Sequence, residues 1–81
     1  MTNMSIESTV RDVISRHMEV PLEQVTRQAS FGHDLGADSL DNVEIIIKLE
    51  KAFQIEIPEE QSQRFKTVAM VIDYITSVKR R

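Results

Sequence analysis

The sequence contains no cysteine, and its 81 residues include only two histidines, two glycines and two prolines. The absence of cysteine excludes a disulfide framework, a thiolate nucleophile and a cysteine-ligated metal site. His17 and His33 are too few and too far apart in the chain to indicate a zinc site. We therefore expect no dedicated metal site, while weak binding of divalent cations by clustered acids stays open.

Long hydrophobic runs are also missing. No apolar stretch approaches the roughly 18 residues that a membrane-spanning helix needs. The first seven residues lack the basic-then-apolar order of a signal peptide. No repeat, low-complexity segment or Pro/Gly-rich linker divides the chain, so residues 1–81 are expected to form a single domain. Together these absences predict a soluble, cytoplasmic protein, and we expect it to be a monomer.

Charge is weak overall but unevenly placed. The formal net charge is −3, yet residues 34–60 carry eight acids and two lysines, a net −6, and the remainder carries +3. An acidic centre would steer a basic partner towards it. The same charge would repel phosphates, so nucleic acid is not expected as a ligand. The alternative interpretation is an ordinary solvated surface.

Apolar residues recur at helical spacing in three segments, which predicts an all-α fold. The first helix is expected over residues 5–18, the second over residues 39–53, and the last behind a Thr67 cap. A short helix is expected near Pro58, because proline suits the first helical turn. The predicted architecture is a small four-helix bundle with three longer helices and one short one.

A long connection over residues 21–38 joins the first two helices. The first helix should end near Val20, since a residue before proline avoids the α conformation, and a turn of helix is expected over residues 22–25. Loops of this length are usually functional or disordered. Apolar anchors favour an ordered loop, with Phe31 in the core; they are Val25, Ala29, Phe31 and Leu35.

The connection runs into the stretch Asp34–Asp41, around which the chain is organised. Gly36 can take a positive φ, which permits a sharp turn before the helix. Asp38 and Ser39 are both preferred N-cap residues, so Ser39 is predicted to lie at the helix start. An attached phosphate would be stabilised there by unpaired backbone N–H groups and the helix dipole. The simpler interpretation is an unmodified N-cap serine.

The second helix has two apolar stripes. At about 100° per residue, one stripe comprises Ile45, Ile46, Leu49 and Phe53, and the other comprises Leu40, Val43 and Ile47. A surface helix needs one stripe to pack on its own core. The second stripe, which begins next to Ser39, is therefore either covered by the long loop or exposed to receive a partner.

These residues resemble the acyl carrier proteins of dissociated fatty acid synthesis. The resemblance rests on Asp34–Asp41, on Val43 and Glu44, and on residues 56–58, and it covers most of the chain without a gap. In that family the serine of the Asp-Ser-Leu motif carries 4′-phosphopantetheine through a phosphodiester bond, which implies attachment at Ser39. It also implies a non-catalytic carrier of acyl thioesters. The implied partners are a phosphopantetheinyl transferase and fatty acid synthesis or acyl transfer enzymes with basic patches.

The resemblance also implies roles for other residues. Those matching the partner-recognition positions are Asp38, Leu40, Asp41, Val43, Glu44 and Ile47. Those matching the pocket for the acyl chain are Phe31, Ile45, Leu49, Ile57, Phe65, Val71 and Ile75. Each pocket residue is otherwise simply a core residue. Phe65 is larger than the isoleucine that the family commonly has, and we expect it to shorten or redirect the pocket.

Other functions are less well supported by the residues. Ser39 has no base assigned by the sequence, and His33 would serve as one only by coincidence. His17 lies late in the first helix, where a cation is favoured, and needs no further role. Lys48 and Lys51 depart from the family pattern and favour a dedicated carrier for polyketide, lipid A or other specialised acyl transfer. A helical interaction module without modification is the remaining alternative.

Overall fold

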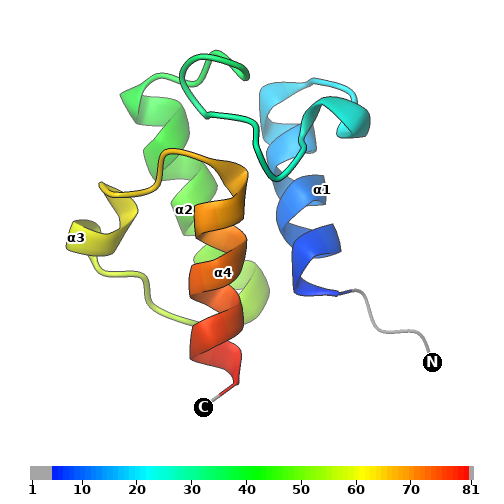
Figure 1. Cartoon of the computed structure of the whole chain (residues 1–81). Helices are drawn as coiled ribbons and strands as arrows, with labels where there is room; N and C mark the ends of the chain where they lie inside the picture. The colour runs from blue at the N-terminus through cyan, green and yellow to red at the C-terminus, as the bar shows by residue number, and fades with distance from the viewer. Residues whose placement is uncertain (1–4, 81) are drawn as a thin grey trace.

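The computed structural model describes residues 5–80 and shows an all-helical chain (Figure 1). Its elements are α1 (Ile6–Met18), the 3-10 turn η1 (Leu22–Gln24), α2 (Ser39–Phe53), α3 (Glu59–Ser62) and α4 (Val68–Lys79). The predicted all-α class, with three longer helices and one short one, is confirmed. Between residues 5 and 80 the only β-type pairing is an isolated bridge from Ser30 to Thr67. Of the basic tail, Arg81 lies outside the described residues.

The helix boundaries follow from capping residues. Ser5, Asp38 and Thr67 precede the three longer helices, and each side chain accepts the backbone N–H of the residue three positions on. Such bonds satisfy donors that a helix start leaves unpaired. α1 and α2 end at Glu19 and Gln54, which take left-handed conformations with φ of 57° and 56°. None of the described helices is long and apolar enough to cross a membrane.

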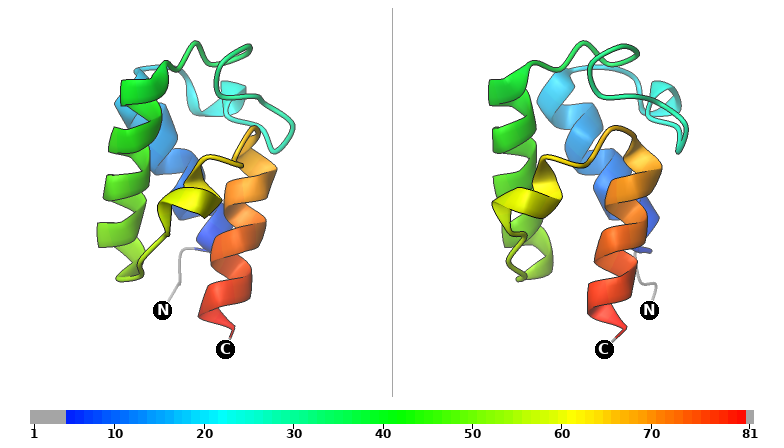
Figure 2. Two further views of the ribbon diagram at one scale, coloured as in Figure 1. Left: turned by 90° about the vertical axis from the view of Figure 1, so that its left-hand side faces the viewer. Right: turned by 60° about the vertical axis from the view of Figure 1, so that its left-hand side comes forward.

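The core lies between α1, α2 and α4, with α1 against both of the others (Figure 2). The apolar stripe of each helix points inward, so burial of these stripes holds the three helices together. No polar or charged side chain of the described chain is buried. The largest fully buried side chains are Val10, Ile14, Val25, Ile45, Leu49, Val68, Val71 and Ile75.

The long connection crosses one end of the bundle and is ordered by both apolar and polar contacts (Figures 1 and 2). All four of its predicted anchors are buried, including Phe31, which is 5% exposed. The Phe31 N–H donates to the Lys66 carbonyl at 3.0 Å, and the Val68 N–H donates to the Ala29 carbonyl at 3.0 Å. The connection is therefore attached to the start of α4, which fixes the point where α2 begins.

Two arginines add polar ties to this connection. Arg11 of α1 donates to the carbonyl oxygens of Val25 and Leu22 at 2.7 and 3.1 Å. Arg27 of the connection pairs with Glu7 of α1 at 3.4 Å and with Asp73 of α4 at 3.0 Å. These contacts link the loop to α1 and α4.

Candidate functional site

Ser39 is the first residue of α2, and Asp38 is its N-cap. The Asp38 side chain accepts the Asp41 N–H at 2.9 Å, and the Asp41 side chain accepts the Asp38 N–H at 3.2 Å. The interpretation of Ser39 as an ordinary cap is therefore wrong, because Asp38 holds that position through a reciprocal bond with Asp41. The Ser39 side chain is exposed and is not used to cap the helix.

The backbone around Ser39 suits a negatively charged group. The first N–H groups of α2 lie beside its side chain, at the positive end of the helix dipole. The preceding turn depends on Gly36, whose φ is +73°, a left-handed conformation that side chains disfavour. A Cβ built on Gly36 meets no atom within 4 Å, so the need for glycine comes from the backbone angle and not from crowding.

An open groove adjoins Ser39 on the side facing α3. Its apolar walls include Phe31, Val43, Ile46 and Phe65, and Lys66 lies at its rim. A second, interior hollow of only about 10 Å³ lies behind it, lined in part by Ile45, Ile46 and Val71. Phe31 and Phe65 line both. Phe65 is only partly buried, so it stands between the groove and the core.

The seven predicted pocket residues are mostly brought together. Phe31, Ile45, Leu49, Val71 and Ile75 belong to one buried cluster, and Phe65 packs against it. Ile57 is also buried, and its N–H donates to the Glu50 carboxylate at 2.7 Å. The core in this structure is closed, because the interior hollow has space for about one water molecule only.

The second stripe of α2 is exposed. Leu40, Val43 and Ile47 have exposed fractions of 64%, 54% and 44%. The long loop does not cover them, so the possibility that the stripe is buried is excluded. Asp38 and Glu44 are exposed and Asp41 is half-buried. All six predicted recognition residues thus lie on or beside one face of α2, which we call the α2 face.

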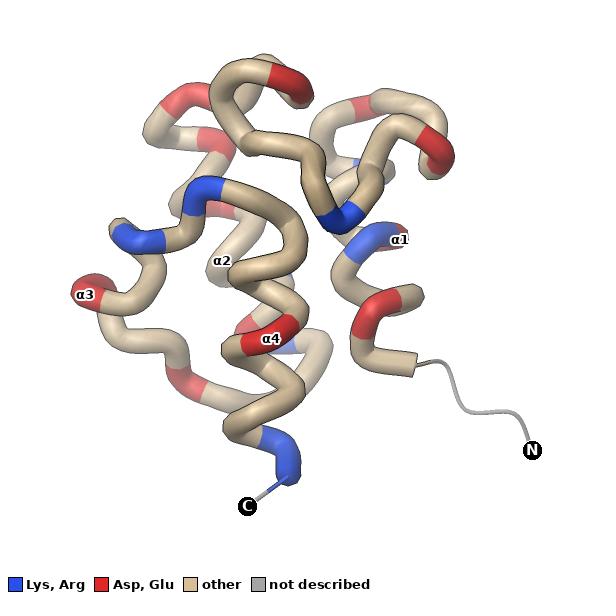
Figure 3. Tube along the Cα trace, in the orientation of Figure 1, with Lys and Arg blue, Asp and Glu red and all other residues tan. Residues whose placement is uncertain are grey.

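Acidic residues predominate around the site, although Lys48 and Lys51 also lie on α2 (Figure 3). Acidic positions lie on α2 and on the loop before it, and basic positions lie on the neighbouring connection between α3 and α4. The Asp34 carboxylate accepts the Ser30 N–H at 2.8 Å, and this bond, helped by the Ser30 hydroxyl, lowers the Asp34 pKa. The pKa of Asp41 is lowered first by the Asp38 N–H and then by His17. Both carboxylates are therefore held ionised.

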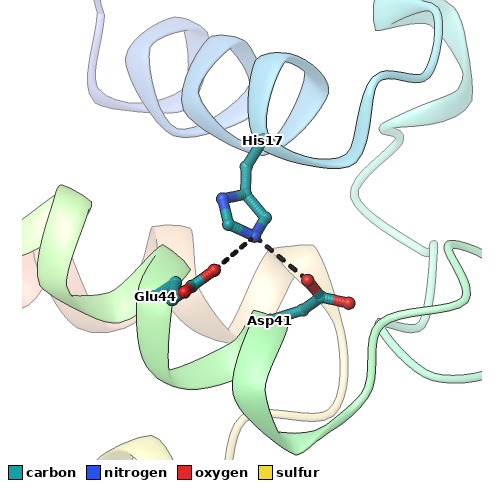
Figure 4. A group of neighbouring side chains, drawn as sticks. All are labelled: His17, Asp41 and Glu44. Carbon is teal, nitrogen blue, oxygen red and sulfur yellow. Dashed lines mark hydrogen bonds and ion pairs between the residues drawn. The ribbon is translucent and has the colours of Figure 1, made fainter.

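His17 has contacts that the sequence did not suggest. Its side chain is 9% exposed, and its Nε2 atom lies 3.2 Å from Asp41 Oδ1 and 3.4 Å from Glu44 Oε1 (Figure 4). Its Nδ1 atom lies 2.9 Å from Lys48 Nζ. The expectation that His17 has no role beyond the end of α1 is therefore too limited. Its position three residues after Ile14, at the edge of the buried stripe, was the available signal.

A catalytic pair at Ser39 has no geometric support. His33 lines the same groove, but the described chain shows no hydrogen bond between these two side chains and no third group that would orient them. A nucleophilic serine requires both a base and an orienting partner. The arrangement is better suited to covalent attachment at an exposed hydroxyl than to catalysis by it.

Comparison with known proteins agrees with this geometry. Residues 8–75 match the family described as the phosphopantetheine attachment site. The chain is 49% identical over 70 residues to an acyl carrier protein from Porphyromonas gingivalis, covering 86% of this chain and 90% of that protein. It is 40% identical over 80 residues to an acyl carrier protein from Cyanidioschyzon merolae, covering 99% of this chain and 88% of that protein.

A solved structure shows the same arrangement of helices. This structure, assigned to an acyl carrier protein from Mycobacterium tuberculosis, aligns with a TM-score of 0.86 and 28% sequence identity. The alignment covers 91% of this chain and 99% of the other. The fold and the sequence thus lead to the same group of proteins.

Proposed function

The chain belongs to the acyl carrier protein family of phosphopantetheine-binding proteins, and on this premise we propose that it holds acyl groups as thioesters on a 4′-phosphopantetheine arm attached to Ser39. It delivers these groups to the enzymes of fatty acid synthesis in the cytoplasm. The observation that carries the proposal is the Ser39 side chain, exposed on the first residue of α2 and beside an apolar groove.

The residues around Ser39 fit this prosthetic group. The serine hydroxyl can form the phosphodiester, and the N-terminus of α2 favours the negative charge of the phosphate. The groove offers the apolar side chains of Phe31, Val43 and Phe65 to an arm that lies along the surface. When bound, the group supplies the thiol that carries the acyl chain. The protein supplies attachment and recognition, and its core opens to shield an acyl chain.

Recognition is assigned to the α2 face. Its exposed apolar residues supply area that a partner can bury, and the carboxylates of Asp38, Asp41 and Glu44 attract basic residues. Because Ser39 lies between Asp38 and Leu40 at one end of this face, an enzyme docked on the face would have the attachment point at its edge. A phosphopantetheinyl transferase and the acyl-handling enzymes are the proposed partners, and nucleic acid is not.

One observation favours a second candidate, a dedicated carrier for polyketide, lipid A or other specialised acyl transfer. Lys48 is exposed on α2 and lies 2.9 Å from His17, where it adds positive charge to an otherwise acidic surface. Lys51 is less informative, because it lies in the last turn of α2, where a cation is favoured for structural reasons. An altered surface charge would change which partners bind.

The test is the intact mass of the protein before and after incubation with coenzyme A and a phosphopantetheinyl transferase. We expect a gain of one phosphopantetheine, absent in Ser39→Ala and retained in Ser77→Ala, an exposed serine on α4. Circular dichroism should show that both variants are folded. No gain in the wild-type protein, with a competent enzyme and no arm already present, would favour an unmodified interaction module instead.

A further inference from the structure

His17, Asp41 and Glu44 bring three potential ligand atoms together from two helices. These atoms all lie within 4.8 Å of one another. His17 comes from α1, and the two carboxylates come from adjacent turns of one face of α2 (Figure 4). The imidazole is only 9% exposed, whereas Asp41 and Glu44 are 31% and 48% exposed. The cluster therefore has a fixed inner side and an open outer side.

Two of the three distances within the cluster match a tetrahedral metal shell. With ligand bonds of about 2.0–2.1 Å, any two ligand atoms of a tetrahedral zinc ion lie roughly 3.4 Å apart. His17 Nε2 lies 3.2 Å from Asp41 Oδ1 and 3.4 Å from Glu44 Oε1. The carboxylate oxygens of Asp41 and Glu44 lie within 4.8 Å of each other, and both side chains are partly exposed, so small side-chain rotations could close the shell around a cation. The same distances also suit an imidazole N–H shared by two carboxylates, so the experiment must separate the two.

The capping contact at the start of α2 orients one of the ligands. Asp41 Oδ2 accepts the Asp38 N–H at 3.2 Å, which leaves Oδ1 facing His17. At neutral pH the carboxylate is in the ionised form that a metal requires. Outer contacts of this kind fix a ligand before the metal arrives.

Lys48 contacts the other ring nitrogen of His17 and so affects which nitrogen can bind a cation. Its ammonium Nζ lies 2.9 Å from His17 Nδ1. An ammonium can only donate, so this contact requires Nδ1 to be the acceptor and Nε2 to carry the proton that faces the carboxylates. A metal on Nε2 would reverse this tautomer and would require Lys48, which is exposed, to turn towards solvent. Lys48 therefore competes with an external cation.

We propose that His17, Asp41 and Glu44 form a binding site for a divalent transition-metal cation of the zinc type, bridging α1 and α2. The imidazole selects this class over magnesium and calcium, which prefer sites made only of oxygen ligands. The open side of the cluster leaves a fourth position for water. Such a cation would join the two helices and reduce the negative charge of the α2 face. The site does not depend on Ser39 or on its modification.

The test is titration of Zn²⁺ into the chelator-treated, unmodified full chain, with heat of binding and Tm as readouts. We expect one Zn²⁺ per chain and a rise in Tm that the chelator EDTA reverses. His17→Gln should weaken binding about tenfold or more, because loss of a ligand affects a site at least as much as loss of an outer contact. Lys48→Gln should strengthen binding, since it removes the competing ammonium.

Matched variants keep the result interpretable. His33→Gln changes the other histidine, which lies outside the cluster, and should bind Zn²⁺ as the wild type does. Glu44→Gln alters an exposed ligand and should weaken binding even if His17→Gln unfolds. The proposal would be overturned by an absence of Zn²⁺ binding, by binding that His17→Gln or Glu44→Gln leaves unchanged, or by Mg²⁺ binding as tight as that of Zn²⁺.

Discussion

Phe65 occupies the position that decides how the groove beside Ser39 meets the core. It lines both the groove and the small interior hollow, and its ring packs edge-on against Tyr74 with centroids 5.6 Å apart. An aromatic ring held in this way narrows the route from the attachment point to the core. A smaller side chain would widen that route.

Phe65→Ile is therefore expected to let the protein shield longer acyl chains from solvent than the wild type does. Loss of the edge-on pair should also lower the free energy of unfolding by about 0.5–1.5 kcal/mol. Protection can be measured as the hydrolysis rate of thioesters of increasing chain length. Phe53→Ile, at the far end of α2 and also partly buried, should reduce stability without changing the chain-length limit. An unchanged limit in Phe65→Ile would contradict the assigned role.

Asp34 makes the loop before Ser39 sensitive to acid. Its pKa is lowered mainly by the Ser30 N–H that its carboxylate accepts. A carboxylate whose pKa is lowered by folding adds to the free energy of unfolding. This contribution is fully present when the pH is above the ordinary carboxyl pKa of about 4. That contribution is lost as the pH falls through the lower folded-state value.

We therefore expect Asp34→Asn to have a lower Tm than the wild type at neutral pH, with the difference shrinking below about pH 4. Thermal unfolding followed by circular dichroism at several pH values measures this. Glu56→Gln, which removes an exposed acid in another loop, provides the control and should not reproduce the trend. A difference in Tm that stays constant from neutral to acid pH would show that the ionised form of the Asp34 carboxylate does not stabilise the loop.

At the scale of the secondary-structure element, the role of the exposed apolar stripe of α2 in docking can be tested directly. Ile47→Ala removes an apolar side chain that is 44% exposed, so the stability should change by no more than about 0.5 kcal/mol. If the α2 face is buried by partners, kcat/KM for modification by a phosphopantetheinyl transferase should fall about fivefold, the result of losing roughly 1 kcal/mol of contact.

Leu22→Ala is the matched control for this change. Leu22 is 45% exposed but lies on η1, away from α2, and its truncation should leave kcat/KM unaltered. An equal loss in both variants would indicate a general effect of surface hydrophobicity and would remove the argument for docking on the α2 face.

The helices themselves could be predicted closely from the sequence. α2 begins and ends where expected because a strong cap precedes it and its apolar period is unbroken. The sequence did not decide between Asp38 and Ser39 as the cap, since both residue types are suitable. That choice depends on Asp41, whose carboxylate accepts a hydrogen bond from the Asp38 N–H.

Contacts between distant segments were the least predictable. The contact of His17 with α2 spans 24 residues, and no local pattern indicates its partner.

At the scale of the whole molecule, one small core supports the site. A domain of this size has a free energy of unfolding of roughly 4–12 kcal/mol. Leu49 is fully buried between the helices, so Leu49→Ala should lower that value by about 2–5 kcal/mol. Urea unfolding measures the change. Ile47→Ala, two residues earlier and exposed, is the internal control. A loss under 1 kcal/mol in Leu49→Ala would mean that the core adjusts its packing around the missing side chain.

The helices also place Ser39 and the outer helix ends at opposite poles. α2 begins at the pole formed by the loops, whereas α1 begins and α4 ends at the other (Figures 1 and 2). At about 1.5 Å per residue, the 15 residues of α2 extend over roughly 20 Å between these poles. If the protein is anchored to a bead, a sensor chip or a fluorescent reporter through the end of α4, Ser39 would lie on the side facing away from the anchor. Such tethering should leave modification rates close to those in solution.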